Sequence, residues 1–252
     1  MSWTLTPDQF ALAWARTDGD RIPYPLAVRL SARDSVERAA QLPTLEQWCD
    51  RTLDADLEAA LRLLGSSTVL IEIFGRAPDA SAVRLVRVLG ASSGNISVVA
   101  AQRAGATPER GGDIRLFVGG AKSLSARMVS MLPENTPGTT PRLTAPQDRV
   151  KEDSRDLVTV PVSGPTVSAR IRRMLSRPRA GIGQIVVSVR RANGELRPFG
   201  VLCWIDVAGD GRYVVRTGAD VDIVPVTAEL FAAQLSPMVT AAERAVAHAE
   251  RW

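Results

Sequence analysis

The sequence predicts an α/β protein of the α+β type, with a central antiparallel β-sheet built from two similar meanders. Residues 68–118 and 182–225 alternate apolar and polar side chains with the period of two that marks half-buried strands. Apolar residues at helical spacing stand before and after each stretch. Each half thus reads helix, four-strand meander, helix. We expect a pseudo-twofold relation between the halves, with helices gathered at the two ends of one shared sheet.

The first helix is predicted to begin at Thr6, where Thr6, Pro7 and Gln9 form a capping box with proline at the first helical position. It should end at residues 17–19. Residues 23–26 contain two prolines and are predicted to be extended, because proline disfavours helix in the residue before it.

A second capping box, Thr44 with Gln47, predicts the start of another helical region, which reaches Gly65. Whether this region holds one helix or two stays open. Four strands follow, and their connections are short enough for an antiparallel meander. The alternating apolar residues are Val69, Ile71 and Ile73, then Val83, Leu85 and Leu89, then Ile96, Val98 and Ala100, and finally Ile114, Leu116 and Val118. A helical stripe from Ala121 to Leu132 should stop at Pro133.

Residues 134–146 are rich in proline and threonine and are predicted to be a loop or linker. The chain is therefore one domain, 1–252, whose halves 1–133 and 147–252 are joined by this connection. In the second half Pro165 should start a helix, and strands should begin at Ile185 and Phe199. Asn193-Gly194 and Asp210-Gly211 mark tight turns, and Tyr213 and Val221 lie in two further strands. The terminal helix should be interrupted at Ser236-Pro237, with Met238, Ala241, Ala245, Ala249 and Trp252 on one stripe.

The charge pattern argues weakly for a nucleic-acid partner. The net charge of +4 is spread along the chain, and only Lys122 and Lys151 among its 31 basic residues are lysine. The densest basic cluster supports the alternative reading of a basic nucleic-acid-binding protein and consists of Arg170, Arg172, Arg173, Arg177 and Arg179. Cys49 and Cys203 are too few for a disulfide framework, and no signal peptide or membrane span is recognisable. The expected compartment is the cytoplasm.

The sequence lacks the residues and motifs that the common catalytic mechanisms need. The single histidine, His248, lies four residues from the end, and no GxSxG, HExxH or phosphate-binding loop occurs. Gly181 and Gly183 precede a predicted strand and are interpreted as turn glycines, while residues 206–211 are interpreted as a hairpin turn and not a calcium loop. We therefore expect no enzyme, no cofactor and no metal.

Two runs of residues carry a resemblance that spans nearly the whole chain. The first is Trp3 to Thr6 with Phe10, Trp14 and residues 23–26. The second runs from Arg179 through Gly183, Ile185 and Asn193-Gly194 to Trp204, Asp206 and Tyr213. In these the chain resembles the EspG family, chaperones that escort substrates of the mycobacterial-type (ESX, type VII) secretion system. The resemblance implies a fold flanked by two helical bundles and cytosolic recognition of a PE-PPE heterodimer, whose PPE tip docks between the sheet and the C-terminal bundle. A departure is the short loop at residues 75–81, which makes a clasping role for that segment doubtful.

Partner recognition on this interpretation needs a few apolar anchors in a concave surface, with charges at the rim. The hypothesised anchors come from the second meander and the terminal bundle and are Gln184, Val186, Trp204, Arg216, Phe231 and Met238. If Phe231 and Met238 contact the partner, replacing either with alanine should weaken binding without lowering stability. Which face of the sheet the helices cover is not readable from the sequence.

Overall fold

The computed structural model describes residues 1–17, 19–78, 83–152 and 164–249. Its strands are β1 (Ser2–Leu5), β2 (Val69–Pro78), β3 (Val83–Ser93), β4 (Ile96–Gln102), β5 (Ile114–Gly120), β6 (Leu143–Pro146), β7 (Arg179–Arg190), β8 (Leu196–Val207), β9 (Gly211–Thr217) and β10 (Asp220–Pro225). Its helices are α1 (Pro7–Arg16), α2 (Ser35–Thr52), α3 (Ala55–Ser66), α4 (Leu124–Val129), α5 (Gln147–Lys151), α6 (Val167–Leu175) and α7 (Ala228–Ala249), with a 3-10 turn η1 (Ala121–Ser123).

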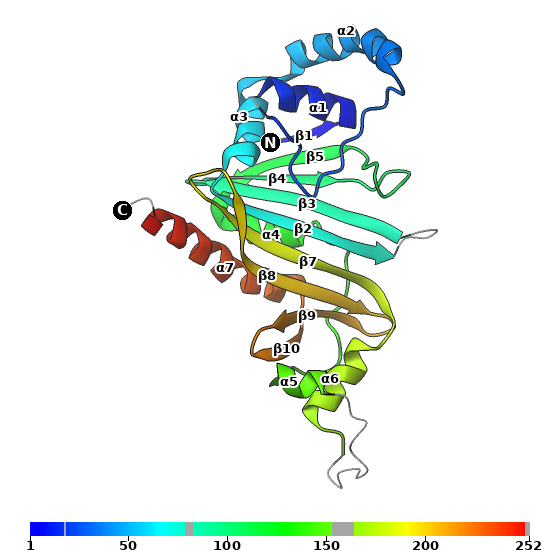
Figure 1. Cartoon of the computed structure of the whole chain (residues 1–252), viewed down its shortest axis with the longest axis vertical. Helices are drawn as coiled ribbons and strands as arrows, with labels where there is room; N and C mark the ends of the chain where they lie inside the picture. Colours follow the sequence, from blue (N-terminus) through cyan, green and yellow to red (C-terminus); the bar gives the residue numbers. More distant parts are fainter. Residues whose placement is uncertain (18, 79–82, 153–163, 250–252) are drawn as a thin grey trace.

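In the described residues the strands form one ten-stranded antiparallel sheet in the order β1-β5-β4-β3-β2-β7-β8-β9-β10-β6 (Figure 1). Both predicted meanders are present, and they join where β2 pairs with β7. Counted inward from either edge, the strands follow the same order. The edge strand, β1 or β6, comes first in sequence, and the four strands of its meander follow from the last to the first. A quantitative superposition of the halves by a twofold rotation stays a prediction.

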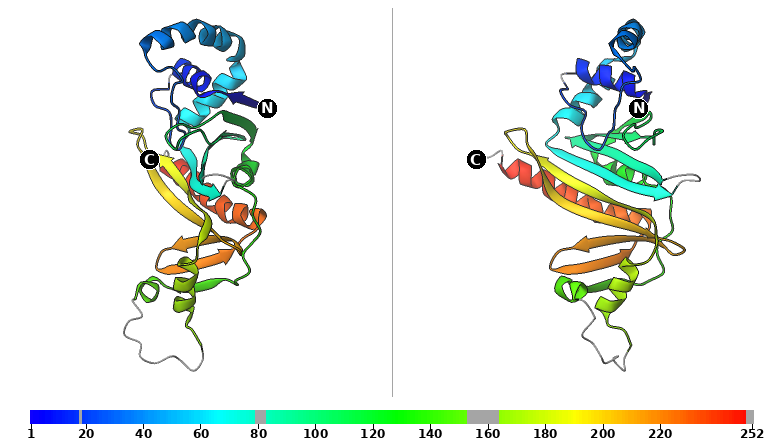
Figure 2. Two further views of the ribbon diagram at one scale, coloured as in Figure 1. Left: turned by 90° about the vertical axis from the view of Figure 1, so that its right-hand side faces the viewer. Right: turned by 45° about the vertical axis from the view of Figure 1, so that its right-hand side comes forward.

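The helices cover the two faces of the sheet differently. On one face α4 and α7 pack against the middle strands, and their core includes Ile71, Ile185, Trp204 and Phe231. On the opposite face α1 and α3 cover the first meander, and α5 and α6 cover the outer strands of the second. Figures 1 and 2 show these two groups at the two ends of the molecule, with α7 along the middle on the other side. No helix of the described ranges covers the middle of this second face, over β2, β7 and β8; we call it the open face.

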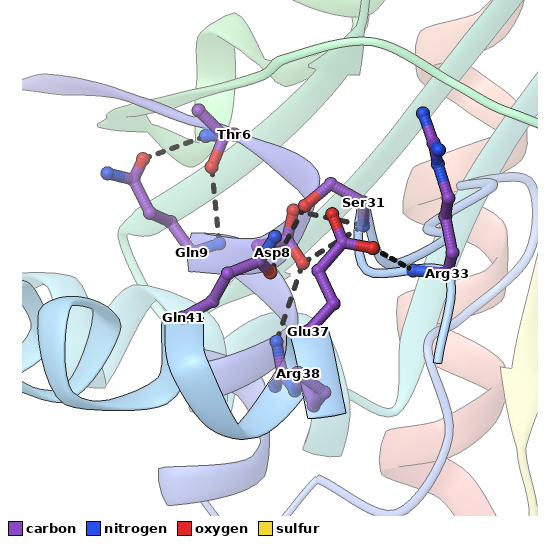
Figure 3. A network of polar contacts seen from close by, with 8 residues as sticks. All are labelled: Thr6, Asp8, Gln9, Ser31, Arg33, Glu37, Arg38 and Gln41. Atoms are coloured by element: carbon purple, nitrogen blue, oxygen red, sulfur yellow. Dashed lines mark hydrogen bonds and ion pairs between the residues drawn. The ribbon is translucent and has the colours of Figure 1, made fainter. Parts of the chain in front are cut away.

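The N-terminal capping box is confirmed, and Figure 3 shows it beside a second polar cluster. Thr6 N donates to Gln9 Oε1 at 2.9 Å, and Gln9 N donates to Thr6 Oγ1 at 3.3 Å. The Asp8 carboxylate accepts from Ser31 N at 3.2 Å and from Arg38 Nη1 at 3.4 Å. These bonds hold the segment before α2 against α1.

The predicted start of the second helical region at Thr44 is wrong. The helix α2 begins nine residues earlier, because Asp34 is its N-cap and accepts from Glu37 N at 2.8 Å. Pro43 lies inside α2 on an exposed side, where water can satisfy the carbonyl that loses its partner. A second N-cap, Asp54, starts α3, so the region holds two helices.

The predicted linker is also partly wrong. Leu143 to Pro146 form edge strand β6, paired with β10, and the side chains of Leu143 and Ala145 are buried. The residues before β6 are held against β9, since Arg212 N donates to Thr136 O at 2.8 Å and Thr140 N donates to Tyr213 Oη at 2.9 Å. A four-residue strand is too short to show a period in the sequence, and tertiary pairing decides it.

Smaller corrections concern turns and helix boundaries. Residues 23–26 form a turn, not an extended segment, with Leu26 N donating to Pro23 O at 3.1 Å and a cis Tyr24–Pro25 bond. The helix α4 ends at Val129, before Pro133, and α6 starts after its N-cap Thr166. Strand β2 continues through Pro78, so the predicted loop at 75–81 is strand up to that residue, and its remainder lies outside the described residues.

The terminal helix differs from its prediction in continuity and in phase. The helix α7 runs unbroken through Ser236-Pro237, with Pro237 exposed. Its buried stripe is Phe231, Leu235, Val239 and Ala242, whereas Ala241 and Ala245 are exposed and Trp252 lies outside the described residues. Apolar residues occur on both sides of this helix, so contact with the sheet selects the stripe.

Candidate functional site

The open face is hollowed into a groove of about 460 Å³ above β2, β7, β8 and β9, bounded by the end of α6. Its side chains from the strands are Phe74, Arg76, Ile182, Gln184, Cys203, Ile205, Val215 and Thr217, and Leu175 and Arg179 complete it. The groove therefore lies between the central sheet and the end of α6, on the face opposite α7.

Sheet register explains how residues far apart in sequence come together in the groove. Phe74 pairs with Gln184, Gln184 with Cys203, and Cys203 with Val215. Directly paired residues on adjacent antiparallel strands point to the same face, so these four side chains form one row across the groove. The row is apolar except for the Gln184 amide, and the guanidinium groups of Arg76 and Arg179 lie at its margin.

The groove floor is supported from below by Trp204. Its indole lies on the other face of the sheet, across Gly75 and Gly183, and the residue is 1% exposed. A Cβ at Gly183 would lie 2.1 Å from Trp204 Cη2, and one at Gly75 would lie 2.6 Å from the same atom. The prediction of turn glycines at Gly181 and Gly183 is thus wrong. Both lie within β7, and Gly183 is needed because the backbone and the ring approach so closely.

A buried ion pair joins the end of β8 to the start of β9. Arg212 Nε and Nη2 donate to the two carboxylate oxygens of Asp206 at 2.7 and 2.9 Å, and both side chains are almost fully buried. A Cβ at Gly181 would lie 2.6 Å from Asp206 Oδ2. Asp206 is therefore engaged by an arginine inside a hairpin, which agrees with the hairpin interpretation of residues 206–211.

The turn after β8 carries a second anionic centre, Asp210. Burial would raise the pKa of its carboxyl, but bonds donated by Thr139, Tyr213 and Arg177 outweigh burial and lower that pKa to about 2. The Tyr213 hydroxyl donates at 2.7 Å and Arg177 at 2.9 Å. This network ties the connection between the halves at Thr139, the residue Arg177 just before β7, and Tyr213 of β9 to the turn after β8.

Apolar surface continues from the groove along the open face. Tyr24 is 52% exposed, and its ring lies 5.6 Å from that of Phe74. Val186 is half-buried, and its partner Val201 on β8 is 45% exposed. Beside them lies Glu72, whose carboxylate accepts from Ser188 Oγ at 3.4 Å and whose pKa is raised by burial. The face thus offers a band of apolar side chains with one partly buried acid.

The six predicted anchors fall on opposite faces. Gln184 lines the groove and is exposed, and Val186 stands on the same open face. Trp204 and Phe231, at 1% and 0% exposure, belong to the core under α7, so neither is open to a partner in this structure. Arg216 donates to Gln234 of α7 at 2.7 Å, and half-buried Met238 packs above Gly200. These last four residues share the α7 side.

The sequence reasoning missed Phe74, Cys203 and Val215, which share the row of Gln184. Cys203 and Val215 alternate in phase on their strands, so both were visible as strand positions. What was missing was the register that places them beside Gln184. Leu175 enters the groove only because α6 packs over the outer strands, and Arg179 enters it as the first residue of β7.

No helix in the described ranges is long and apolar enough to span a membrane. Within the same ranges, no group of three or more His, Cys, Asp or Glu residues is placed to hold a metal ion.

Comparison with known proteins gives two findings. Residues 6–237 match the model of the EspG family. The fold resembles that of the Mycobacterium tuberculosis type VII secretion system chaperone EspG5, solved in complex with a PE25-PPE41 dimer. That similarity has a TM-score of 0.62 and 16% identity, and covers 92% of this chain and 94% of that chain. No curated protein matches in a sequence comparison. The fold similarity confirms the predicted architecture.

Proposed function

Because the chain belongs to the EspG family, we propose that it is a secretion chaperone that binds the tip of a PE-PPE heterodimer and keeps it soluble for export by a type VII secretion system. The observation that carries the proposal is the groove on the open face. It lies between the sheet and the end of α6, whereas the predicted docking site lay between the second meander and the terminal helix α7, on the other face; we propose the open face in its place. The solved complex of EspG5 with PE25-PPE41 supports this class of partner.

The chemistry of the groove suits holding a partner and not transforming one. Its centre is apolar with one amide and one thiol, and its margin carries arginines, which do not serve readily as bases. Burial raises the pKa of the Cys203 thiol, so it stays protonated and is a poor nucleophile. The single histidine, His248, is exposed on α7. We therefore propose a non-enzymatic protein that covers an apolar tip until it is handed on.

The arginines at the margin give the partner its orientation. Arg76 is exposed and stands at the end of the groove near the start of β7, so an acidic side chain or a helix C-terminus beside the apolar tip would lie against it; Arg179 beside it is held by its bond to Leu175 O. The cytoplasm is the proposed compartment, since both cysteines, Cys49 and Cys203, are free thiols.

The nucleic-acid alternative gains no support. Three arginines of the predicted cluster are engaged within the chain. Arg172 donates to Arg149 O at 2.8 Å, Arg177 donates to Asp210 at 2.9 Å, and Arg179 donates to Leu175 O. Side chains held in this way are not arranged along a track for phosphates.

A single substitution in the groove tests the proposal. Gln184→Lys places an ammonium group in the middle of the apolar row, where docking would strip its water. We expect the affinity for a PE-PPE heterodimer to fall at least about tenfold, equivalent to roughly 1.4 kcal/mol. The matched control is Gln47→Lys on α2, where the glutamine is exposed and far from the groove.

Binding is measured by titrating a purified heterodimer against each variant, after circular dichroism has shown that both variants fold. Equal affinities for Gln184→Lys and Gln47→Lys would exclude this groove as the site. If wild-type protein binds no PE-PPE heterodimer of its own genome, the proposed function itself is wrong.

A further inference from the structure

A second concave surface lies on the α4 side of the sheet, over β3, β4 and β5. It encloses about 560 Å³ and is distinct from the groove, which is on the opposite face. Its apolar floor includes Val86, Val88 and Ala101, and the half-buried Met131 closes it. The residues that distinguish it are basic and aromatic.

Two arginines converge on one ring in this surface. The guanidinium carbon of Arg115, on β5, lies 4.7 Å from the centre of the Phe117 ring, and that of Arg127, on α4, lies 5.4 Å from the same centre. Both distances are within the range of a cation–π interaction. The aromatic ring thereby fixes two exposed cations from different elements beside one another.

No ion pair among the described residues neutralises Arg103, Arg115 or Arg127 of this surface. By contrast, Arg142, Arg177 and Arg212 elsewhere each hold a carboxylate. Arg103 and Arg115 line the hollow together with Arg84, and Arg127 stands beside it on the Phe117 ring, so these guanidinium groups create a local positive potential that an anionic group would relieve.

We propose that this surface, made of Arg103, Arg115, Phe117, Arg127 and Met131, docks an acidic segment of a second protein. The carboxylates of such a segment would accept from the guanidinium groups, while an apolar side chain between them would cover Phe117 and Met131. A lipid surface is flat and does not enter a hollow. A nucleic acid needs a charged track along which successive phosphates bind, whereas these arginines surround a single hollow.

This surface of Arg103, Arg115, Phe117, Arg127 and Met131, which we call the α4 surface, and the groove lie on opposite faces of the sheet. A protein docked on the α4 surface would leave the groove free, so this chain would hold its substrate and a second protein at the same time. The acidic segment should therefore bind equally well whether or not the groove is occupied.

The test compares two double substitutions with the same change in charge. Arg115→Glu with Arg127→Glu reverses the α4 surface, and Arg51→Glu with Arg244→Glu reverses two exposed arginines on α2 and α7. The probe is a labelled peptide that alternates glutamate with leucine. We expect it to bind wild type and the control pair similarly and to bind the α4 pair at least about tenfold more weakly.

The same titrations are repeated with Phe117→Leu, a single-stranded oligonucleotide and anionic vesicles. Loss of stacking in Phe117→Leu should weaken the peptide severalfold with the fold intact. Equal peptide affinity in the two double variants would overturn the proposal. It would also be overturned if the oligonucleotide or the vesicles, and not the peptide, distinguished those variants.

Discussion

Gly183→Ala tests how the groove floor is built. In the structure the added Cβ would lie 2.1 Å from Trp204 Cη2 and 2.6 Å from the carbonyl oxygen of Phe74. Carbon atoms in contact prefer about 3.5–4.0 Å, so the indole would have to move by well over an ångström. Trp204 is 1% exposed and sits between the sheet and α7, where no space receives it.

The cost follows from overpacking a close-packed core, which is typically about 1–3 kcal/mol. In a protein of this size each kcal/mol lowers the melting temperature by about 2–4 °C, so we expect a loss of about 2–12 °C. The control is Gly218→Ala, since a Cβ at Gly218 would meet nothing within 4 Å. Urea unfolding followed by tryptophan fluorescence gives both free energies of unfolding.

A double variant identifies the clash. Combining Gly183→Ala with Trp204→Phe should make the alanine less costly than it is alone, because the smaller ring leaves room above residue 183. If Gly183→Ala unfolds at the same urea concentration as Gly218→Ala, the packing of Trp204 across β7 is refuted. Because the displaced floor also carries Gln184, Gly183→Ala should weaken partner binding as well.

Three further predictions concern other parts of the molecule. Phe231→Ala should cost about 3–5 kcal/mol because this side chain is fully buried, whereas Met238→Ala at a half-buried site should cost clearly less; equal losses would contradict this. Burial raises the pKa of Glu72, so the folded state binds its proton more tightly and loses stability as pH rises through that pKa. Glu72→Gln should therefore raise the melting temperature more at pH 7 than at pH 4, and an equal gain at both would count against it. The pKa of Asp210 is lowered from 3.8 to about 2, so its contribution to stability is present above pH 3.8 and is lost as the pH falls toward 2. Asp210→Asn should destabilise at pH 7 and approach wild type near pH 2, and a deficit that does not change with pH would be the contrary result.

Local patterns predicted the elements whose formation depends on neighbours in sequence. The capping box at Thr6 and the alternation in both meanders correspond to the observed α1 and to strands β2–β5 and β7–β10. The order helix, meander, helix was readable in the same way. Predictions failed where a distant partner decides the local structure. Edge strand β6 forms because β10 is available to pair. Gly183 lies within a strand because β7 pairs with β2 and β8, and a glycine is needed there because Trp204 leaves no room for a side chain.

The candidate site shows the same division. From sequence alone, Gln184 and Trp204 are both strand residues of one meander, and Phe231 and Met238 are both apolar residues of one helix. Period two assigns strand residues to two faces, but it does not say which face receives a helix. That choice is made when α7 packs on one side, burying Trp204 and Phe231, while α6 reaches only the outer strands of the other side.

The sequence by itself therefore determined the strands of the two meanders, their pairing within each meander and the family resemblance, because the alternation of apolar side chains and turn chemistry act between near neighbours. The groove was decided only by tertiary structure. It exists because β2 and β7, more than a hundred residues apart, pair at the middle of the sheet, and because the helices leave that middle uncovered on one face.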